Sequence, residues 1–453
     1  MPDTPAAASP TGPSATGPSH IGPGRQRQSA IYRAGLSGLR PAVPTDFAAL
    51  EEAARKASSP KGWAYVAGGA GEGRTMRNNR EAFDRWAIVP RMLRGVGARD
   101  LSTTVLGTDL PAPFLLAPVG AGQLIDPDAD LLTARAAAAT GVPYVFTNQG
   151  GTPLEHTAEA MRNSSGGATP HWMQLYWSVD EGLVDSMIRR AEAAGAGALV
   201  VTLDTTVLGW RPQDLNLGSL PFAQGLGIGQ YTSDPRFGEI VAERVRRAAE
   251  PGAPQGEKPK VNLAAIRSLL SITRSHPGGF WSNLRSPIPR ASVETFLDIY
   301  SNPQLSWDHV ATLRDRTSLP IVLKGILHPD DAKQAFELGV DAIVVSNHGG
   351  RQVDASIASL DALVAVRDAI GPEPTVLMDS GIRTGADVFM ALALGADAVL
   401  LGRPYMYGMA VAGQRGVEEV IANVIAELDL TMALTGVEAV GSITRGHLVD
   451  RRG

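Results

Sequence analysis

The residues with the strongest chemical character lie in Ser346–Asp354, directly after the apolar run Ala342–Val345. An apolar run of this length is typical of a buried parallel strand, so the segment is expected to start at the end of a strand. His348 can move a proton near neutral pH, and Arg351 can hold a carboxylate through two hydrogen bonds. This pattern predicts an enzyme that acts on the carbon next to a carboxylate. The alternative is a histidine that caps a strand and an arginine in a surface ion pair.

Composition limits the classes of protein that fit. The chain has 453 residues, of which 44% are hydrophobic and 19% charged, with a net charge of -5, 8 histidines and no cysteine. A large core is therefore possible, whereas disulfides, thiolate metal sites and cysteine nucleophiles are excluded. The sequence contains no dense basic patch that would indicate nucleic-acid binding. It also contains no run of about 18 apolar residues that would indicate a membrane span. We expect a cytoplasmic protein that binds neither nucleic acid nor membrane.

Three regions are predicted along the chain. Residues 1–28 are rich in Pro, Gly, Ser and Ala and are expected to form a disordered arm rather than a signal peptide. Residues 29–112 are expected to form an extension with helices at Asp46–Ala57 and Lys61–Val66. Residues 113–450 are expected to form the main domain, interrupted by an insert at about 212–306.

The main domain repeats a short apolar strand, a loop and an alanine-rich helix, which indicates an α/β protein with a (β/α)8 TIM barrel. The predicted strands are Pro113–Pro118, Pro143–Thr147, Trp172–Tyr176, Ala198–Asp204, Pro320–Lys324, Ala342–Ser346, Thr375–Asp379 and Ala398–Gly402. The predicted helices between them include Leu131–Thr140, Glu181–Ala194, Asp330–Leu338, Ile357–Ala369 and Ala386–Leu394. A doubly wound open sheet is the competing architecture. It needs a glycine-rich phosphate turn after the first strand, which Ala117–Gly122 matches poorly.

The insert follows the fourth predicted strand and is rich in Pro, Gly and Ser, with a basic helix-like patch at Glu243–Ala249. A long insert at this point usually acts as a lid or a partner surface. The alternative is a disordered decoration, which we expect at least near Pro251–Lys260.

Polar side chains end nearly every predicted strand. In a barrel these ends share one face, where the chemistry gathers, so they predict an active site. Asp379–Arg383 and Gly402–Pro404 follow the seventh and eighth strands, and there Arg383 and Arg403 could neutralise a phosphate. Lys324 ends an apolar strand, and pattern alone leaves it as a Schiff-base nucleophile, a ligand-binding cation or a solvated cap.

Three motifs together resemble the FMN-dependent L-2-hydroxy acid oxidases and dehydrogenases. They are Ser346–Gln352, Asp379–Asp387 and Gly402–Pro404, and the resemblance runs from about Asp46 to Ile443. It implies an FMN flavoprotein that takes a small 2-hydroxy acid and O2, and a homo-oligomer of four or eight subunits.

The resemblance also implies roles for individual residues. His348 resembles the catalytic base, Asp204 the carboxylate paired with it, Tyr176 the tyrosine near the substrate hydroxyl, and Lys324 the lysine beside the flavin N1 and O2 atoms. Tyr65, Arg211 and Arg351 resemble the residues that bind the substrate carboxylate, although pattern alone makes Tyr65 a packed core aromatic. The positions that resemble flavin-binding residues are Pro118, Val119, Gly120, Thr147, Gln174, Thr202, Ser346, Asp379, Gly381, Arg383, Gly402 and Arg403. Asp204 is expected to favour the protonated form of His348 and so to make it a stronger base.

Local details are similar to one branch of the family, the lactate 2-monooxygenases. Gly120 stands where many members carry alanine, and Gly209–Pro212, Thr232–Pro235 and His328–Asp331 resemble loops of that branch. The segment from about Ala248 to Pro289 departs from the pattern by its length.

The leading hypothesis is therefore an L-lactate 2-monooxygenase, which converts lactate and O2 to acetate, CO2 and water. One alternative is a 2-hydroxy acid oxidase that releases 2-oxo acid and hydrogen peroxide. Two others are a non-catalytic flavin-binding protein and a metal-dependent hydrolase, although the scattered histidines supply no metal site.

Overall fold

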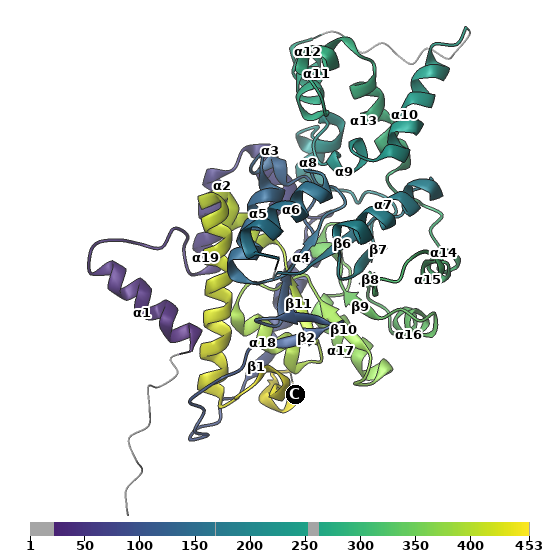
Figure 1. The fold of residues 1–453 in the computed structure, drawn as a ribbon. Coiled ribbons are helices and arrows are strands. Elements are labelled where there is room, and N and C mark those ends of the chain that lie inside the picture. Colours follow the sequence, from purple (N-terminus) through teal and green to yellow (C-terminus); the bar gives the residue numbers. More distant parts are fainter. Residues whose placement is uncertain (1–21, 168, 252–261, 453) are drawn as a thin grey trace, which may run out of the picture.

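The protein folds around a closed barrel of eight parallel strands, as the computed structural model shows for residues 22–167, 169–251 and 262–452 (Figure 1). The strands are β4 (Phe114–Leu116), β5 (Tyr144–Phe146), β6 (His171–Leu175), β7 (Leu199–Thr202), β8 (Ile321–Ile326), β9 (Ala342–Val345), β10 (Thr375–Met378) and β11 (Ala398–Leu401). They pair in chain order, and β11 closes on β4. All eight predicted strands and the TIM barrel are confirmed, and the open-sheet alternative is wrong.

The strands are short runs of apolar residues that are buried on both faces, as expected where side chains fill the barrel and helices cover it. Their parallel register brings the carboxyl ends to one mouth. For example, Thr202 of β7 pairs with Lys324 of β8, which pairs with Val344 of β9. The barrel therefore gathers polar residues that lie far apart in the sequence.

Seven helices surround the barrel. They are α5 (Ala129–Thr140), α6 (Leu154–Ser165), α7 (Glu181–Ala194), α16 (Pro329–Glu337), α17 (Ser359–Ile370), α18 (Gly385–Ala393) and α19 (Arg403–Thr435). The five helices predicted between strands are confirmed to within two residues. Helices α6 and α19 were not predicted from the sequence, and α19 is the long helix beside the barrel in Figure 1.

The extension contains α1 (Pro23–Gly35), α2 (Phe47–Ala57), α3 (Pro60–Ala67) and α4 (Arg74–Asp84), and the pairs β1 (Trp86–Ile88) with β12 (Leu448–Asp450) and β2 (Thr103–Val105) with β3 (Thr108–Leu110). The two predicted helices, α2 and α3, are confirmed. Asp46 caps α2 by accepting from the Ala49 N–H, and Ser59 caps α3 by accepting from the Gly62 N–H.

The predicted disordered arm is wrong for residues 23–28, which belong to α1, while residues 1–21 lie outside the described residues. Tertiary contacts order α1. The Gly24 N–H donates to Asp429 Oδ2 at 2.9 Å, and Arg27 donates to Asn423 and Glu419. Pro23 in the first turn was the sequence signal for a helix start.

The insert forms a helical lobe above the barrel mouth, which we call the roof lobe (Figure 1). It contains α8 (Pro212–Asn216), η2 (Pro221–Gln224), α9 (Gly229–Thr232), α10 (Pro235–Ala248), α11 (Leu263–Ser275), α12 (Phe280–Arg285) and α13 (Ile288–Ile299), and is followed by α14 (Trp307–Ala311) and α15 (Leu313–Arg316). The basic patch lies within α10, and the expected disorder near Pro251–Lys260 falls almost wholly outside the described residues.

The roof lobe has an aromatic core of its own. Phe296 stacks on Tyr300 with ring centroids 4.8 Å apart and contacts Phe222 and Tyr231 at 5.2 and 4.7 Å. Such rings bury large apolar areas in defined geometries. The lobe is therefore a packed unit rather than a loose loop.

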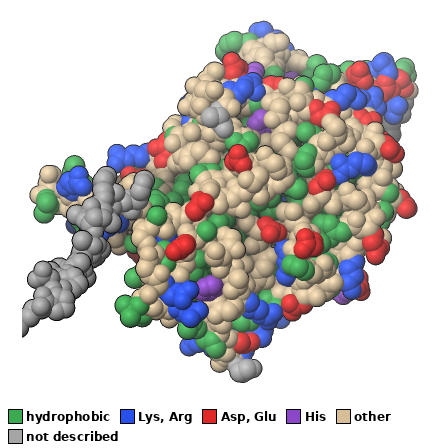
Figure 2. Space-filling view, turned by 60° about the horizontal axis from the view of Figure 1, so that its bottom comes forward, with side chains coloured by type: hydrophobic (Ala, Val, Ile, Leu, Met, Phe, Trp, Pro, Cys, Tyr) green, Lys and Arg blue, Asp and Glu red, His purple; other side chains and the backbone are tan. Residues whose placement is uncertain are grey.

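Within the described ranges, no helix is long and apolar enough to cross a membrane. On the face shown in Figure 2, acidic and basic side chains are interspersed rather than gathered by sign.

A buried ion pair joins α1, α19 and the loop before β2. Arg99 Nε donates to Asp429 Oδ1 at 2.6 Å and Nη2 to Oδ2 at 2.9 Å, and the two side chains are 8% and 0% exposed. Asp429→Asn should lower the free energy of unfolding by about 3–5 kcal/mol, because it leaves a buried guanidinium without its anion. Thermal unfolding of the holoprotein measures this. Glu294→Gln, which breaks exposed pairs with Arg290 and Arg244, is the control and should change stability little. Equal effects would show that the buried pair is not a stabilising link.

Candidate active site

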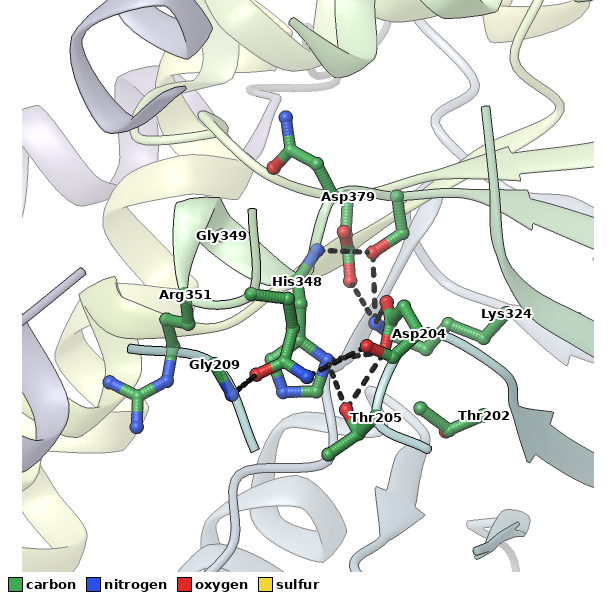
Figure 3. Close-up of polar contacts among 12 residues, drawn as sticks. Thr202, Asp204, Thr205, Gly209, Lys324, His348, Gly349, Arg351 and Asp379 are labelled. Atoms are coloured by element: carbon green, nitrogen blue, oxygen red, sulfur yellow. Dashed lines mark hydrogen bonds and ion pairs between the residues drawn. The ribbon is translucent and has the colours of Figure 1, made fainter. Parts of the chain in front are cut away.

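His348 lies at the centre of the barrel mouth, in the short turn η3 (His348–Gly350) after β9. Its φ of 56° is left-handed, which costs a non-glycine residue roughly 1–2 kcal/mol. Two contacts hold it there: its N–H donates to Ser346 Oγ at 3.0 Å, and its Nδ1 lies 2.7 Å from Asp204 Oδ1 (Figure 3). The strained turn therefore fixes the ring, and Nδ1 is the nitrogen that Asp204 engages.

Asp204 and Lys324 form an ionic group beside His348 (Figure 3). Lys324 Nζ lies 3.1 Å from Asp379 Oδ2 and 3.9 Å from Asp204 Oδ2. Burial raises the pKa of Asp204, but His348 and Lys324 outweigh burial and hold that pKa to about 2. Burial lowers the pKa of Lys324, but Asp379 and Asp204 raise it above its usual value. Both groups are thus charged at neutral pH, which makes a Schiff-base role for Lys324 poorly suited to the site.

Asp204 raises the pKa of His348, as expected, but other groups reverse the net direction of the shift. Burial lowers that pKa most, Asp204 raises it, and Lys324 and Arg211 lower it further, so it lies below the usual value. His348 is consequently neutral at pH 7, which is the state in which an imidazole accepts a proton.

Arg211 and Arg351 form one pair of cations in the cavity. Arg351 donates to the backbone carbonyls of Tyr65 and Gly68, and its guanidinium lies 4.8 Å from the centre of the Tyr65 ring. Arg211 donates to the Arg351 carbonyl and to Gln352 Oε1. Burial, followed by repulsion from Arg211, lowers the pKa of Arg351 to about 9. Two like charges held together in this way are suited to bind a carboxylate.

Arg383 and Arg403 form a second pair of cations at the ends of β10 and β11. Arg403 donates to the carbonyls of Val66, Gly349 and Gly68, and Arg383 to that of Ile382. Burial, followed by repulsion from Arg403, lowers the pKa of Arg383 to about 10. In the described parts of the chain no carboxylate lies within ion-pair distance of either guanidinium. The pair therefore suits a phosphate group.

One cavity of about 990 Å³, its open mouth included, contains most of the predicted site residues. Those that line it are Tyr65, Pro118, Val119, Gly120, Tyr176, Arg211, Lys324, His348, Arg351, Asp379, Gly381, Arg383, Gly402 and Arg403.

The remaining predicted residues lie behind the cavity wall and hold it in place. Thr147 Oγ1 lies 3.1 Å from Gln174 Oε1, and Gln174 Nε2 donates to Thr202 Oγ1 at 2.9 Å. Ser346 Oγ accepts from Lys324 Nζ at 2.9 Å. Together with Asp204, these side chains connect the ends of five neighbouring strands.

The cavity wall also contains residues that were not predicted, among them Gln149, Leu208, Phe222 and Tyr300. Gln149 follows Thr147 by two residues, so its position after a strand was a signal. Phe222 and Tyr300 belong to the roof lobe, and no local pattern in the sequence places them over the barrel.

Comparison with known proteins agrees with this geometry. A model of the FMN-dependent dehydrogenase family matches residues 54–450. The L-lactate oxidase of Lysinibacillus sphaericus (strain C3-41) is 37% identical over 414 residues, which cover 90% of this chain and 94% of that protein. The FMN-dependent alpha-hydroxy acid dehydrogenase qulF of Penicillium citrinum is 38% identical over 92% of this chain and 94% of its own length. The crystal structure of a mandelate oxidase superposes with a TM-score of 0.69 at 32% identity, covering 90% and 98% of the two chains.

Arg383→Met should weaken FMN binding by about 10- to 100-fold, because it removes a charged hydrogen-bond donor from the phosphate. Fluorescence titration of the apoprotein with FMN measures this. Riboflavin, which lacks the phosphate, is the matched control, and its affinity should stay nearly unchanged. A variant that loses both flavins equally would show that Arg383 supports the fold of the site rather than the phosphate.

Proposed function

The chain belongs to the FMN-dependent dehydrogenase family and is an oxidoreductase that oxidises 2-hydroxy acids with FMN, and from this premise we propose that it is an L-lactate 2-monooxygenase. In this reaction lactate and O2 give acetate, CO2 and water. Because this family consists of FMN-dependent oxidoreductases, the chain is neither the non-catalytic flavin-binding protein nor the metal-dependent hydrolase of the other two hypotheses.

The residues at the ends of β10 and β11 are our candidates to hold FMN. Arg383 and Arg403 would bind its phosphate, and Lys324 would supply a positive charge beside its ring. When bound, FMN accepts the two electrons of the oxidation. The other proposed contacts are Pro118, Val119, Gly120, Thr147, Gln174, Thr202, Ser346, Asp379, Gly381 and Gly402.

The arginines on the other side of the cavity are our candidates to orient the substrate. Arg211 and Arg351 would hold its carboxylate together with Tyr65, and Tyr176 would lie near its hydroxyl. Burial and Asp204 raise the pKa of Tyr176, so its phenol stays protonated and can donate a hydrogen bond. Neutral His348 would accept the proton that leaves C2 or its hydroxyl, while Asp204 stabilises the imidazolium that forms.

The roof lobe covers the site, and this is the observation that most directly supports the monooxygenase proposal. Arg211 precedes the roof lobe, and Phe222 and Tyr300 reach the cavity from its two ends. A packed cover slows the exit of the 2-oxo acid, so that peroxide formed beside it can react with it. Gly120, the residue shared with the monooxygenase branch, lies in the same cavity.

The second candidate is an oxidase that releases 2-oxo acid and hydrogen peroxide. The names of two relatives favour it, since the proteins of Lysinibacillus sphaericus and of Nostoc sp., at 37% and 36% identity, are L-lactate oxidases. Both candidates share the oxidation of lactate and differ in whether the product is retained.

Product analysis with L-lactate under O2 separates the candidates. The wild type should give acetate and CO2, and Tyr300→Ala should raise the yield of pyruvate and peroxide several-fold, because it opens the cover. Tyr300→Phe keeps the ring, so it controls for the hydroxyl and should behave like the wild type. Pyruvate and peroxide as the main products of the wild type would favour the oxidase.

The rate of anaerobic flavin reduction should rise with pH and level off before pH 7. The base acts when neutral, and the pKa of His348 lies below its usual value of 6.5. The acidic limb of the pH profile, in which the rate rises with pH, should therefore lie below pH 6.5. Asp204→Asn removes the group that raises this pKa, so the limb should move to lower pH while the plateau falls by roughly 10²-fold or more. Stopped-flow measurements across pH 4.5–8 test this. A limb above pH 6.5, or one that moves upward in the variant, would contradict the assignment of His348 as the base.

A further inference from the structure

Gln149 lies in the loop between β5 and α6, and its side chain is a buried polar group with no partner. It is 6% exposed and lines the cavity. Among the residues that the structure describes, none donates a hydrogen bond to its amide or accepts one from it. Because the amide lines the cavity and makes no hydrogen bond within the described protein, its donor and acceptor are available to a ligand there.

The backbone of Gln149 is fixed from two sides. Its N–H donates to Thr147 Oγ1 at 3.2 Å, and its carbonyl accepts from the Ala121 N–H at 2.9 Å. The next carbonyl, that of Gly150, accepts from the Gly229 N–H of the roof lobe at 2.8 Å. The amide therefore has a defined place in the wall.

Gly120 gives the amide its space. A Cβ at Gly120 would lie 2.9 Å from Gln149 Cβ and 3.0 Å from Oε1, so alanine would displace this side chain. The glycine that marks the monooxygenase branch thus has a specific consequence in this chain: it lets a glutamine side chain lie against the loop that follows β4.

The position of Gln149 relative to the arginines indicates which part of the substrate it faces. With the carboxylate at Arg211 and Arg351 and C2 beside His348, the side chain of the substrate points to the remaining wall. Gln149 and Phe222 both line the cavity, and a Cβ at Gly227 would lie 3.0 Å from the Gln149 carbonyl oxygen and 3.1 Å from the Phe222 ring, so the two residues are neighbours in its wall. Phe222 offers only apolar contact there, whereas Gln149 offers both a donor and an acceptor.

We propose that Gln149 determines specificity by hydrogen bonding to the side chain of the substrate, so that the enzyme prefers L-2-hydroxy acids with a hydroxyl, carbonyl or amide group beyond C2 to purely aliphatic ones. This inference rests on the proposed function and narrows its substrate class. L-Lactate is still a substrate, but it leaves the amide without a partner.

An isosteric pair of substrates tests the inference. The side chains of L-glycerate and L-2-hydroxybutyrate have the same number of heavy atoms beyond C2, and differ by a terminal hydroxyl in place of a methyl group. The measurement is the second-order rate constant for anaerobic reduction of the bound flavin. The wild type should favour glycerate, and Gln149→Leu should lower the glycerate-to-hydroxybutyrate ratio by about 10- to 100-fold. Gln149→Met serves as a second apolar variant if the first binds FMN poorly.

Phe222→Leu is the matched control on the same wall. It changes the size of the site without changing its hydrogen bonds, so it should alter both rate constants in parallel and leave their ratio within a few-fold. A wild-type preference for hydroxybutyrate, or a ratio that Gln149→Leu and Gln149→Met leave unchanged, would overturn the inference while leaving the proposed oxidation intact. Failure of lactate and of both test acids to reduce the flavin would refute the proposed function, and the inference with it.

Discussion

The structure depends on the enclosure of positive charge at the mouth of the barrel. Arg211, Arg351, Arg383 and Arg403 meet in one cavity, and within the described ranges no carboxylate pairs with any of them at ion-pair distance. Backbone carbonyls solvate these guanidinium groups in part but carry no net negative charge. The lowered pKa values of Arg351 and Arg383 express this imbalance. Anions would complete such a site, and under the proposed function a flavin phosphate and a substrate carboxylate would supply one for each pair.

The acidic residues of the mouth lie around Lys324 rather than beside the arginines, so the negative and positive charges of the site are separated. Asp204 and Asp379 flank Lys324 beside His348, so their charge is already compensated and does not compete for the arginines. His348 lies between this compensated group and the cations that await ligands. Its lowered pKa follows from that position, because burial and two nearby cations outweigh one carboxylate. A base that is neutral at pH 7 is thus a consequence of the same charge arrangement that binds the anions.

Much of this arrangement could be predicted from the sequence, because it depends on strand ends. Each barrel strand is a short apolar run with a polar residue just beyond it, and parallel register alone brings Thr147, Lys324, His348 and Arg403 to one mouth. The net pKa of His348 could not be predicted, since it depends on distances to charges from three other elements. Helix α1 was missed because contacts with α19 order it rather than its own composition. Phe222 and Tyr300 were missed because only the packing of the roof lobe places them over the cavity.

Hydrogen bonds connect the roof lobe to the part of the cavity wall that contains Gln149. Gln230, in α9 of the lobe, is 2% exposed; its Oε1 accepts from the Leu154 N–H at 2.8 Å, and its Nε2 donates to the Thr152 carbonyl at 3.0 Å. From the barrel side, Asp130 accepts from the Gly151 and Thr152 N–H groups. The loop after β5 is therefore clamped between the barrel and its cover. Any displacement of the cover large enough to release a product would strain the backbone that positions Gln149. Product retention and recognition of the substrate side chain are for this reason expected to change together when the lobe is altered, although their residues lie on different elements.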